Sequence, residues 1–197
     1  MWLLSSADHP VLPLQWCVVI GASLVAAVTD VQSRRIPNLL SLPLLATGLV
    51  WAASGWGASG GGLAGLGEAL LSCLLLAFPF VLLFAFGGGG AGDAKLMGGI
   101  GAWLGLHDGV IALGSVCVFG IALAVVFAVA RRRVGSAMMN LGRFLRSFSL
   151  MLFSKGELRE VATGMLPETS EMQTLPYAPA IFLGVAASAV GVYLWSA

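Results

Sequence analysis

Charged residues are scarce in this sequence. Of its 197 residues only 10% are Asp, Glu, Lys or Arg, whereas 58% are hydrophobic, and the mean hydropathy is +0.95. Soluble domains carry roughly 25% charged residues. A chain with so little charge could not cover a water-exposed surface, so we expect it to lie in a membrane.

Paired cysteines and basic patches are missing as well. The three cysteines stand singly in apolar runs without any C-x-x-C pair, which argues against a zinc site or a disulfide framework. No basic patch with interleaved aromatic residues is present, so we expect no nucleic-acid partner. We also expect no metal and no cofactor.

Long apolar runs, by contrast, are abundant. A helix needs about 20 apolar residues to cross a hydrocarbon core about 30 Å thick. Six candidate spans meet or approach this length, at about residues 11–28, 39–56, 66–86, 96–106, 110–130 and 177–195. The fourth is too short to cross alone, and we expect it to begin in the preceding Gly-rich stretch or to be shielded by its neighbours. The sequence predicts an all-α, polytopic membrane protein with about six transmembrane helices in a single domain, residues 1–197.

The basic residues predict how these spans are oriented. Arg34 and Arg35 follow the first span, Lys95 lies between the third and fourth, and three arginines at 131–133 follow the fifth. The opposite connections contain no Lys or Arg. Because positive residues favour the cytoplasmic side, we expect a multi-pass protein of the inner (plasma) membrane with both termini outside.

The longest polar stretch, residues 131–176, falls on the expected cytoplasmic side. Its first part, residues 136–153, has an imperfect apolar stripe flanked by Arg143 and Arg146, which predicts a helix on the membrane surface. The rest is acidic and predicts a loop. A solvated linker and a substrate-gating segment both remain open for it.

Two carboxylates stand out, because few ionisable groups lie near or within the apolar segments and such groups are costly to keep there. Asp30 ends the first span, and Asp93 lies where the third span gives way to the fourth. The predicted topology brings both to the same face. Of two neighbouring carboxylates one keeps a proton and the other is anionic, which is the division of labour in pepsin. His9 and His107 fall on the opposite side, and no Ser-His-Asp or Cys-His set can be assembled.

Glycines surround Asp93. Five of them precede it closely, at positions 87, 88, 89, 90 and 92. Glycine permits irregular backbone and the close approach of a second chain, which suits a protease because a peptide must be extended before it is cut. A plain hinge between spans is the alternative. A nucleotide loop does not fit, because the glycines follow an apolar helix and lack a G-K-[ST] sequence.

Two motifs resemble those of a known family. Residues 30–38 read D-x-x-x-x-x-I-P-N and residues 90–95 read G-A-G-D-A-K. Together they resemble the catalytic motifs of the aspartic prepilin peptidases, membrane proteases of the GxGD type, and Pro176-Tyr177-Ala178-Pro179 resembles that family's proline-containing final helix. The resemblance extends over residues 11–195.

The resemblance implies a function and a set of site residues. Asp30 and Asp93 would be the catalytic pair, and Gly90 and Gly92 would shape the loop. The remaining positions, whose roles the resemblance leaves less defined, are Arg34, Arg35 and Lys95; the last could place charge near the pair or serve only as a positive-inside anchor.

The implied activity is endopeptidase cleavage of pilin or pseudopilin precursors, which are cut at the cytoplasmic membrane surface between a short basic leader and a hydrophobic helix. The implied partners are the precursor and membrane lipid. Larger members add a Cys-rich segment with C-x-x-C pairs, and some methylate the new N-terminus. Since the sequence has no such pair, we do not expect methyltransferase activity, and the compact chain resembles the peptidases of tight-adherence (Flp-type) pilus systems or small archaeal relatives.

Two other function classes compete with the protease. In a small transporter or channel the two aspartates would bind a cation, although transport sites usually lie near the bilayer midplane. A non-catalytic subunit of a secretion machine would not need an intact aspartate pair. Ion flux without a peptide product would favour the first of these.

Overall fold

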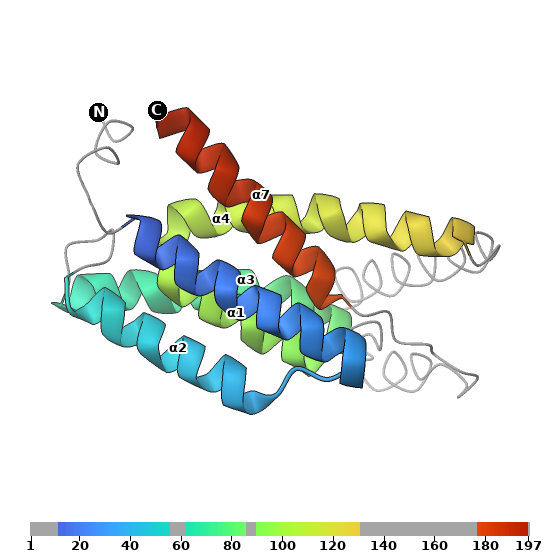
Figure 1. Cartoon of the computed structure of the whole chain (residues 1–197). Coiled ribbons are helices and arrows are strands. Elements are labelled where there is room, and N and C mark those ends of the chain that lie inside the picture. Colours follow the sequence, from blue (N-terminus) through green and yellow to red (C-terminus); the bar gives the residue numbers. More distant parts are fainter. Residues whose placement is uncertain (1–11, 56–61, 86–89, 131–176, 197) are drawn as a thin grey trace, which may run out of the picture.

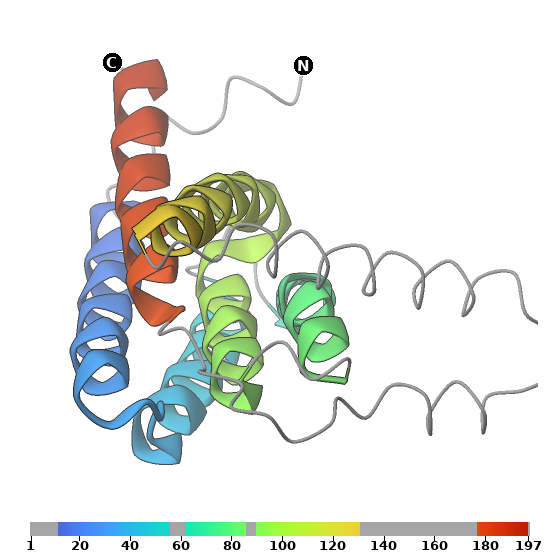
Figure 2. The same ribbon diagram turned by 90° about the vertical axis from the view of Figure 1, so that its right-hand side faces the viewer.

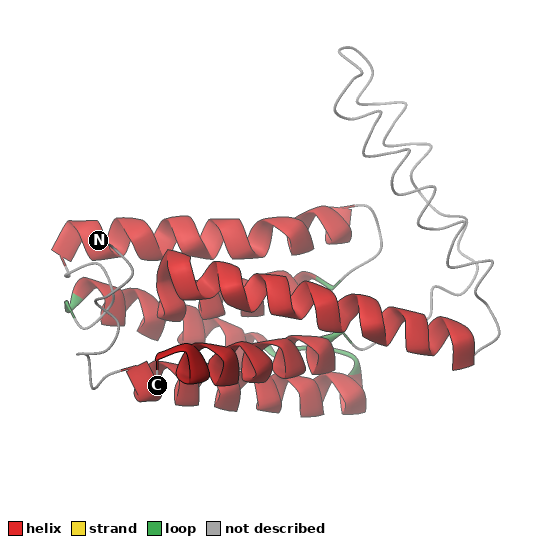
Figure 3. Ribbon diagram, turned by 90° about the horizontal axis from the view of Figure 1, so that it is seen from above, coloured by secondary structure: helices red, strands yellow, loops and turns green. Residues whose placement is uncertain are grey.

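The described part of the chain is entirely helical apart from short connections. The computed structural model describes residues 12–55, 62–85, 90–130 and 177–196. These residues form α1 (Leu12–Ser33), α2 (Asn38–Ala53), α3 (Gly62–Ala85), α4 (Ala91–Ala130) and α7 (Ala178–Ser196). The helices lie alongside one another as a bundle, with the connections at its ends (Figures 1 and 3). The prediction of an all-α protein is therefore confirmed for these residues.

Within the described ranges, three helices are long and apolar enough to cross a membrane, over Leu14–Ser33, Gly62–Phe84 and Ala91–Phe127. Two shorter apolar helices, Asn38–Ala53 and Ala178–Leu194, accompany them. Large hydrophobic side chains are exposed on the outer faces, as in Leu74, Ile121 and Leu194, which fits contact with lipid better than contact with water. The number of six crossings stays a prediction.

The predicted fourth and fifth spans are joined in α4, which bends at Gly105. This glycine has φ 72° and ψ −171°, a conformation that L-residues rarely adopt. The chain turns back at this point, and the second half of α4 returns to the end of the bundle where the first half begins (Figures 1 and 2). The short span expected to need shielding is thus the first half of α4, with α2 and α3 packed against it.

The bend leaves backbone groups of α4 without helical hydrogen-bond partners, and side chains of α3 take the place of those partners. The Ser72 hydroxyl donates to the Gly105 carbonyl oxygen at 2.7 Å, and the Leu106 N–H donates to Glu68 Oε1 at 3.1 Å. An unpaired backbone group in a membrane costs several kcal/mol. Glu68 and Ser72 therefore make the interruption of an apolar helix tolerable.

The first half of α4 lies at the centre of the core. Leu96, Met97 and Ile100 are completely buried. Close helix contact depends on small residues here, because a Cβ atom on Gly101 would lie 2.7 Å from the Ser72 carbonyl oxygen. The two glycines of this region thus have different functions: Gly101 permits contact with α3, and Gly105 forms the bend. The predicted surface helix and loop of residues 131–176 lie outside the described residues.

Candidate active site

Asp30 lies in the last turn of α1 and its side chain is directed into the protein. Only 8% of the residue is exposed. Its Oδ2 accepts a hydrogen bond from the backbone N–H of Ala178, the first residue of α7, at 3.1 Å. The first and last described helices therefore meet at this carboxylate.

Asp93 lies in the first turn of α4 and is also 8% exposed. Its backbone N–H donates to the Gly90 carbonyl oxygen at 3.2 Å, which closes the turn that begins the helix. A carboxylate at this place is favoured by the free N–H groups and the dipole of the helix N-terminus. The acidic residue is thus compatible with the apolar helix that follows it.

The two carboxylates line one cleft of about 230 Å³. The cleft is formed by the end of α1, the connection to α2 and the start of α4. Its lining residues are Asp30, Arg34, Arg35, Ile36, Gly90, Ala91, Gly92 and Asp93. Of the seven site residues named from the sequence, the structure gathers six here, and Lys95 is the exception.

Two glycines leave room in this cleft. A Cβ atom on Gly92 would lie 3.0 Å from the Ile36 Cβ, and one on Gly90 would lie 3.2 Å from Asp93 Oδ2. Gly92 therefore lets the α1–α2 connection approach α4, and Gly90 leaves space beside the carboxyl group. The glycines at 87–89 lie outside the described residues.

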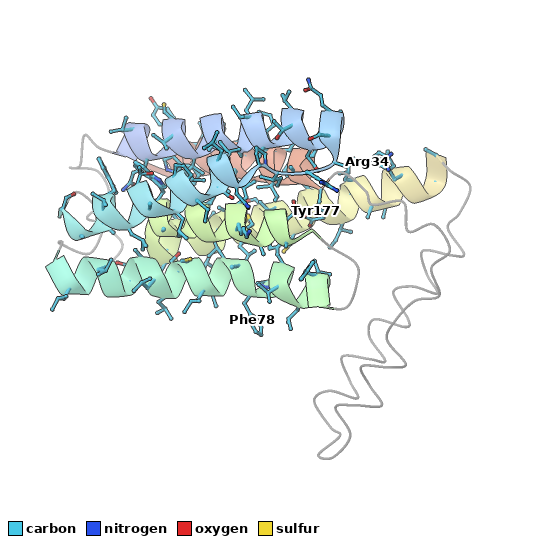
Figure 4. All side chains as sticks on the ribbon, turned by 90° about the horizontal axis from the view of Figure 1, so that it is seen from below. Arg34, Phe78 and Tyr177 are labelled. Atoms are coloured by element: carbon cyan, nitrogen blue, oxygen red, sulfur yellow. The ribbon has the colours of Figure 1, made fainter. Side chains whose placement is uncertain are left out.

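Arg34 turns the chain out of α1 in an uncommon conformation. Its φ is 52°, and it is the one non-glycine residue with positive φ in the described ranges. Its N–H donates to the Asp30 carbonyl oxygen at 2.8 Å, which ends the helix in the manner usually reserved for glycine. Figure 4 shows Arg34 and Tyr177 at the same end of the bundle, while the Phe78 side chain points outward from the bundle.

Lys95 points to α2 and is absent from the residues that line the cleft. Its Nζ donates to Asn38 Oδ1 at 2.9 Å. Asn38 belongs to the first motif and Lys95 to the second, so this bond joins the two motifs directly. The sequence leaves the role of Lys95 open, and it includes Asn38 in the first motif without giving this residue a role in the site.

Comparison with known proteins now identifies the family. The model of the type IV leader peptidase family matches residues 17–125, more than half of the chain. The chain belongs to this family. The resemblance inferred from the two motifs is therefore confirmed.

Individual relatives of this leader peptidase family member are similar over part of their length. A prepilin leader peptidase/N-methyltransferase of Neisseria gonorrhoeae is 30% identical over 105 residues, which cover 53% of this chain and 37% of the relative. One of Burkholderia pseudomallei (strain 1026b) is 40% identical over 88 residues, covering 43% and 28%. The chain thus matches about a third of the length of these relatives. No solved structure gives a significant match.

The region matched to the leader peptidase family contains both acidic residues of the cleft but ends within α4. The Ala178 amide that contacts Asp30 therefore comes from beyond it. Sequence reasoning missed this contact, because a backbone N–H leaves no trace in residue types. The P-Y-A-P segment was the one signal that could have directed attention to it.

Proposed function

We propose that this protein is a prepilin peptidase, an aspartic endopeptidase that removes the short leader of pilin or pseudopilin precursors. The observation that carries the proposal is the shared cleft: Asp30 and Asp93 come from different helices, and both line it while nearly buried. Membership of the leader peptidase family supports the same activity.

The two carboxylates would act as an acid and a base. The ionised one takes a proton from water as the water oxygen attacks the peptide carbonyl carbon, and the protonated one gives its proton to the carbonyl oxygen. The resulting diol then collapses, the C–N bond breaks, and a proton passes to the departing nitrogen. The burial of the two carboxyl groups favours a state in which one is protonated and the other is ionised, because two neighbouring charges in a poorly solvated cleft cost free energy.

The surroundings would hold an extended peptide beside the pair. Gly90 and Gly92 would shape one wall of the cleft, while Arg34 and Arg35 form the connection on the other side. Both arginines are exposed, so they would contact substrate or the phosphates of lipid headgroups at the membrane surface.

We further propose that this end of the bundle faces the cytoplasm. The arginines of the cleft, Lys95 and the arginines at 131–133 would all lie there by the positive-inside rule. Counting the two halves of α4 separately, the chain would cross six times and leave both termini outside. A precursor whose basic leader lies in the cytoplasm would then present its cleavage site at the level of the cleft.

The proposal is confined to the peptidase reaction. The curated relatives are named as both leader peptidases and N-methyltransferases, and the chain covers 37% and 28% of the first two.

The test is processing of a pilin precursor by the purified protein in lipid nanodiscs, read by mass spectrometry of the new N-terminus. Asp30→Asn and Asp93→Asn should each abolish cleavage, because either change removes one half of the acid–base pair. Asp108→Asn is the matched control: this residue also lies in α4, but its carboxylate is bound to the His107 ring at 2.8 Å.

All three variants should remain folded in the membrane. Cleavage by either single variant at the wild-type rate would refute the catalytic pair. Failure of the wild-type protein to cut any precursor bearing a basic leader, together with cation flux through liposomes, would instead favour a transporter.

A further inference from the structure

The start of α7 has no part in the chemistry described so far, although it contacts the cleft. The Ala178 amide donates to Asp30 Oδ2 at 3.1 Å, and Ala178 itself is completely buried. A donor at one oxygen fixes the plane of a carboxylate, and with it the direction in which the other oxygen points. The orientation of Asp30 thus depends on where α7 begins.

Tyr177 determines that position. Its ring packs edge-on against Phe80 of α3, with the centroids 5.6 Å apart and the planes at 69°. Its hydroxyl lies against Gly120 of α4, where a Cβ atom would overlap it. Its carbonyl oxygen accepts the N–H of Ala180 at 2.9 Å, which begins the helix. The ring therefore anchors the start of α7 to both α3 and α4.

We propose that Tyr177 and Ala178 are positioning residues for Asp30: the Tyr177 ring anchors the start of α7, and the Ala178 amide orients the carboxylate for proton transfer. This inference rests on the proposed peptidase function. Catalytic groups displaced by about 1 Å can lose about 100-fold in rate. A chain with both aspartates but a displaced α7 would therefore bind its substrate and cut it slowly.

The decisive experiment removes the N–H group of Ala178 that donates to Asp30. Ala178 is replaced by its α-hydroxy acid, lactic acid, so that an ester oxygen stands where the N–H was and the methyl group is kept. We expect kcat for precursor cleavage to fall by about 10- to 100-fold with KM nearly unchanged, because orientation and not binding is lost. Melting in nanodiscs verifies that the variant is folded.

The matched control is the same replacement at Ala180. An ester at 178 also weakens the Tyr177 carbonyl as an acceptor. The Ala180 ester removes the nearer of the two N–H groups that donate to that same oxygen, leaving the Ile181 N–H at 3.3 Å and the bond to Asp30 in place. Its kcat should stay within about threefold of wild type, because the hydrogen bond to Asp30 is intact. Equal kcat values for the two esters, or an Ala178 ester as active as wild type, would overturn the proposal.

A second route tests the anchor by ordinary mutagenesis. Gly120→Val would push the Tyr177 ring away, and it should lower kcat while leaving KM nearly unchanged. Gly114→Val is the control, because a Cβ atom at Gly114 of α4 meets nothing within 4 Å. If both variants cleave equally well, Tyr177 is not an anchor for the site. Wild-type protein runs in every assay, so its failure to cleave would refute the peptidase function itself and is distinguishable from these outcomes.

Discussion

Lys95 donates a hydrogen bond from its Nζ to Oδ1 of Asn38 at 2.9 Å. The bond joins the fifth residue of α4 to the first residue of α2. The connection between α1 and α2 and the start of α4 both line the cleft. The bond therefore holds together the two segments that form the walls beside the carboxylates. Neither residue lines the cleft itself. We call the Lys95–Asn38 pair a brace, because it holds the cleft walls from outside.

This brace predicts that the two residues act together. Lys95→Met and Asn38→Leu should each slow precursor cleavage by about three- to tenfold, since a hydrogen bond contributes about 1 kcal/mol. The double variant should be no slower than either single one. A double-mutant cycle on kcat/KM measures this coupling. If Lys95→Met is slow and Asn38→Leu is normal, the lysine contacts the substrate instead.

Gly92 should tolerate no side chain. Gly92→Ala places a Cβ atom 3.0 Å from the Ile36 Cβ, so the α1–α2 connection must move away from α4 and the cleft must change shape. We expect a loss of about tenfold or more in cleavage rate. Gly114→Ala is the control in the same helix, and it should leave the rate unchanged and slightly stabilise the fold.

The left-handed conformation of Arg34 predicts an unusual order of stability. At φ 52°, Arg34→Gly should have a free energy of unfolding about 1 kcal/mol higher than Arg34→Ala, because alanine pays the left-handed penalty and glycine does not. Gln32 lies two residues earlier within α1, and there the order should reverse, with Ala above Gly. Denaturant titration in mixed micelles compares the four variants. The same order at both positions would contradict the left-handed turn.

The bend in α4 predicts a role in stability for Glu68. Glu68→Leu leaves the Leu106 N–H without its acceptor, so the free energy of unfolding should fall by about 1–3 kcal/mol. Glu68→Gln keeps an acceptor oxygen and should lose much less. Thermal unfolding in nanodiscs distinguishes the two. Equal losses would mean that the negative charge, and not the hydrogen bond, matters at the bend.

Some of the site could be predicted from residue types alone. Asp30 and Asp93 were recognisable because carboxylates are rare in apolar segments, and Gly92 because glycine permits close approach. The contacts of Ala178 and Asn38 could not be predicted. One is a backbone group that every residue has, and the other is a partner 57 positions away from Lys95, whose pairing depends on how the helices pack.

At Gly105, too, part of the fold could be predicted from residue types and part depends on how the helices pack. Helices could be predicted from apolar length, and a short fourth span from the interruption near His107. A glycine in an apolar span can permit helix contact, as Gly101 does, or form a bend, as Gly105 does, and the sequence does not distinguish the two. The choice depends on Ser72 and Glu68 of α3, which receive the freed backbone groups.

The late position of Ala178 has a consequence for biosynthesis. Both acidic residues have already been translated when the ribosome has completed α4, yet the amide that meets Asp30 belongs to a helix made some fifty codons later. A nascent chain stalled before that helix would hold both acids without their orienting donor. Under the proposed role of Ala178, such a chain would cut its substrate slowly during insertion and reach full activity only when α7 docks.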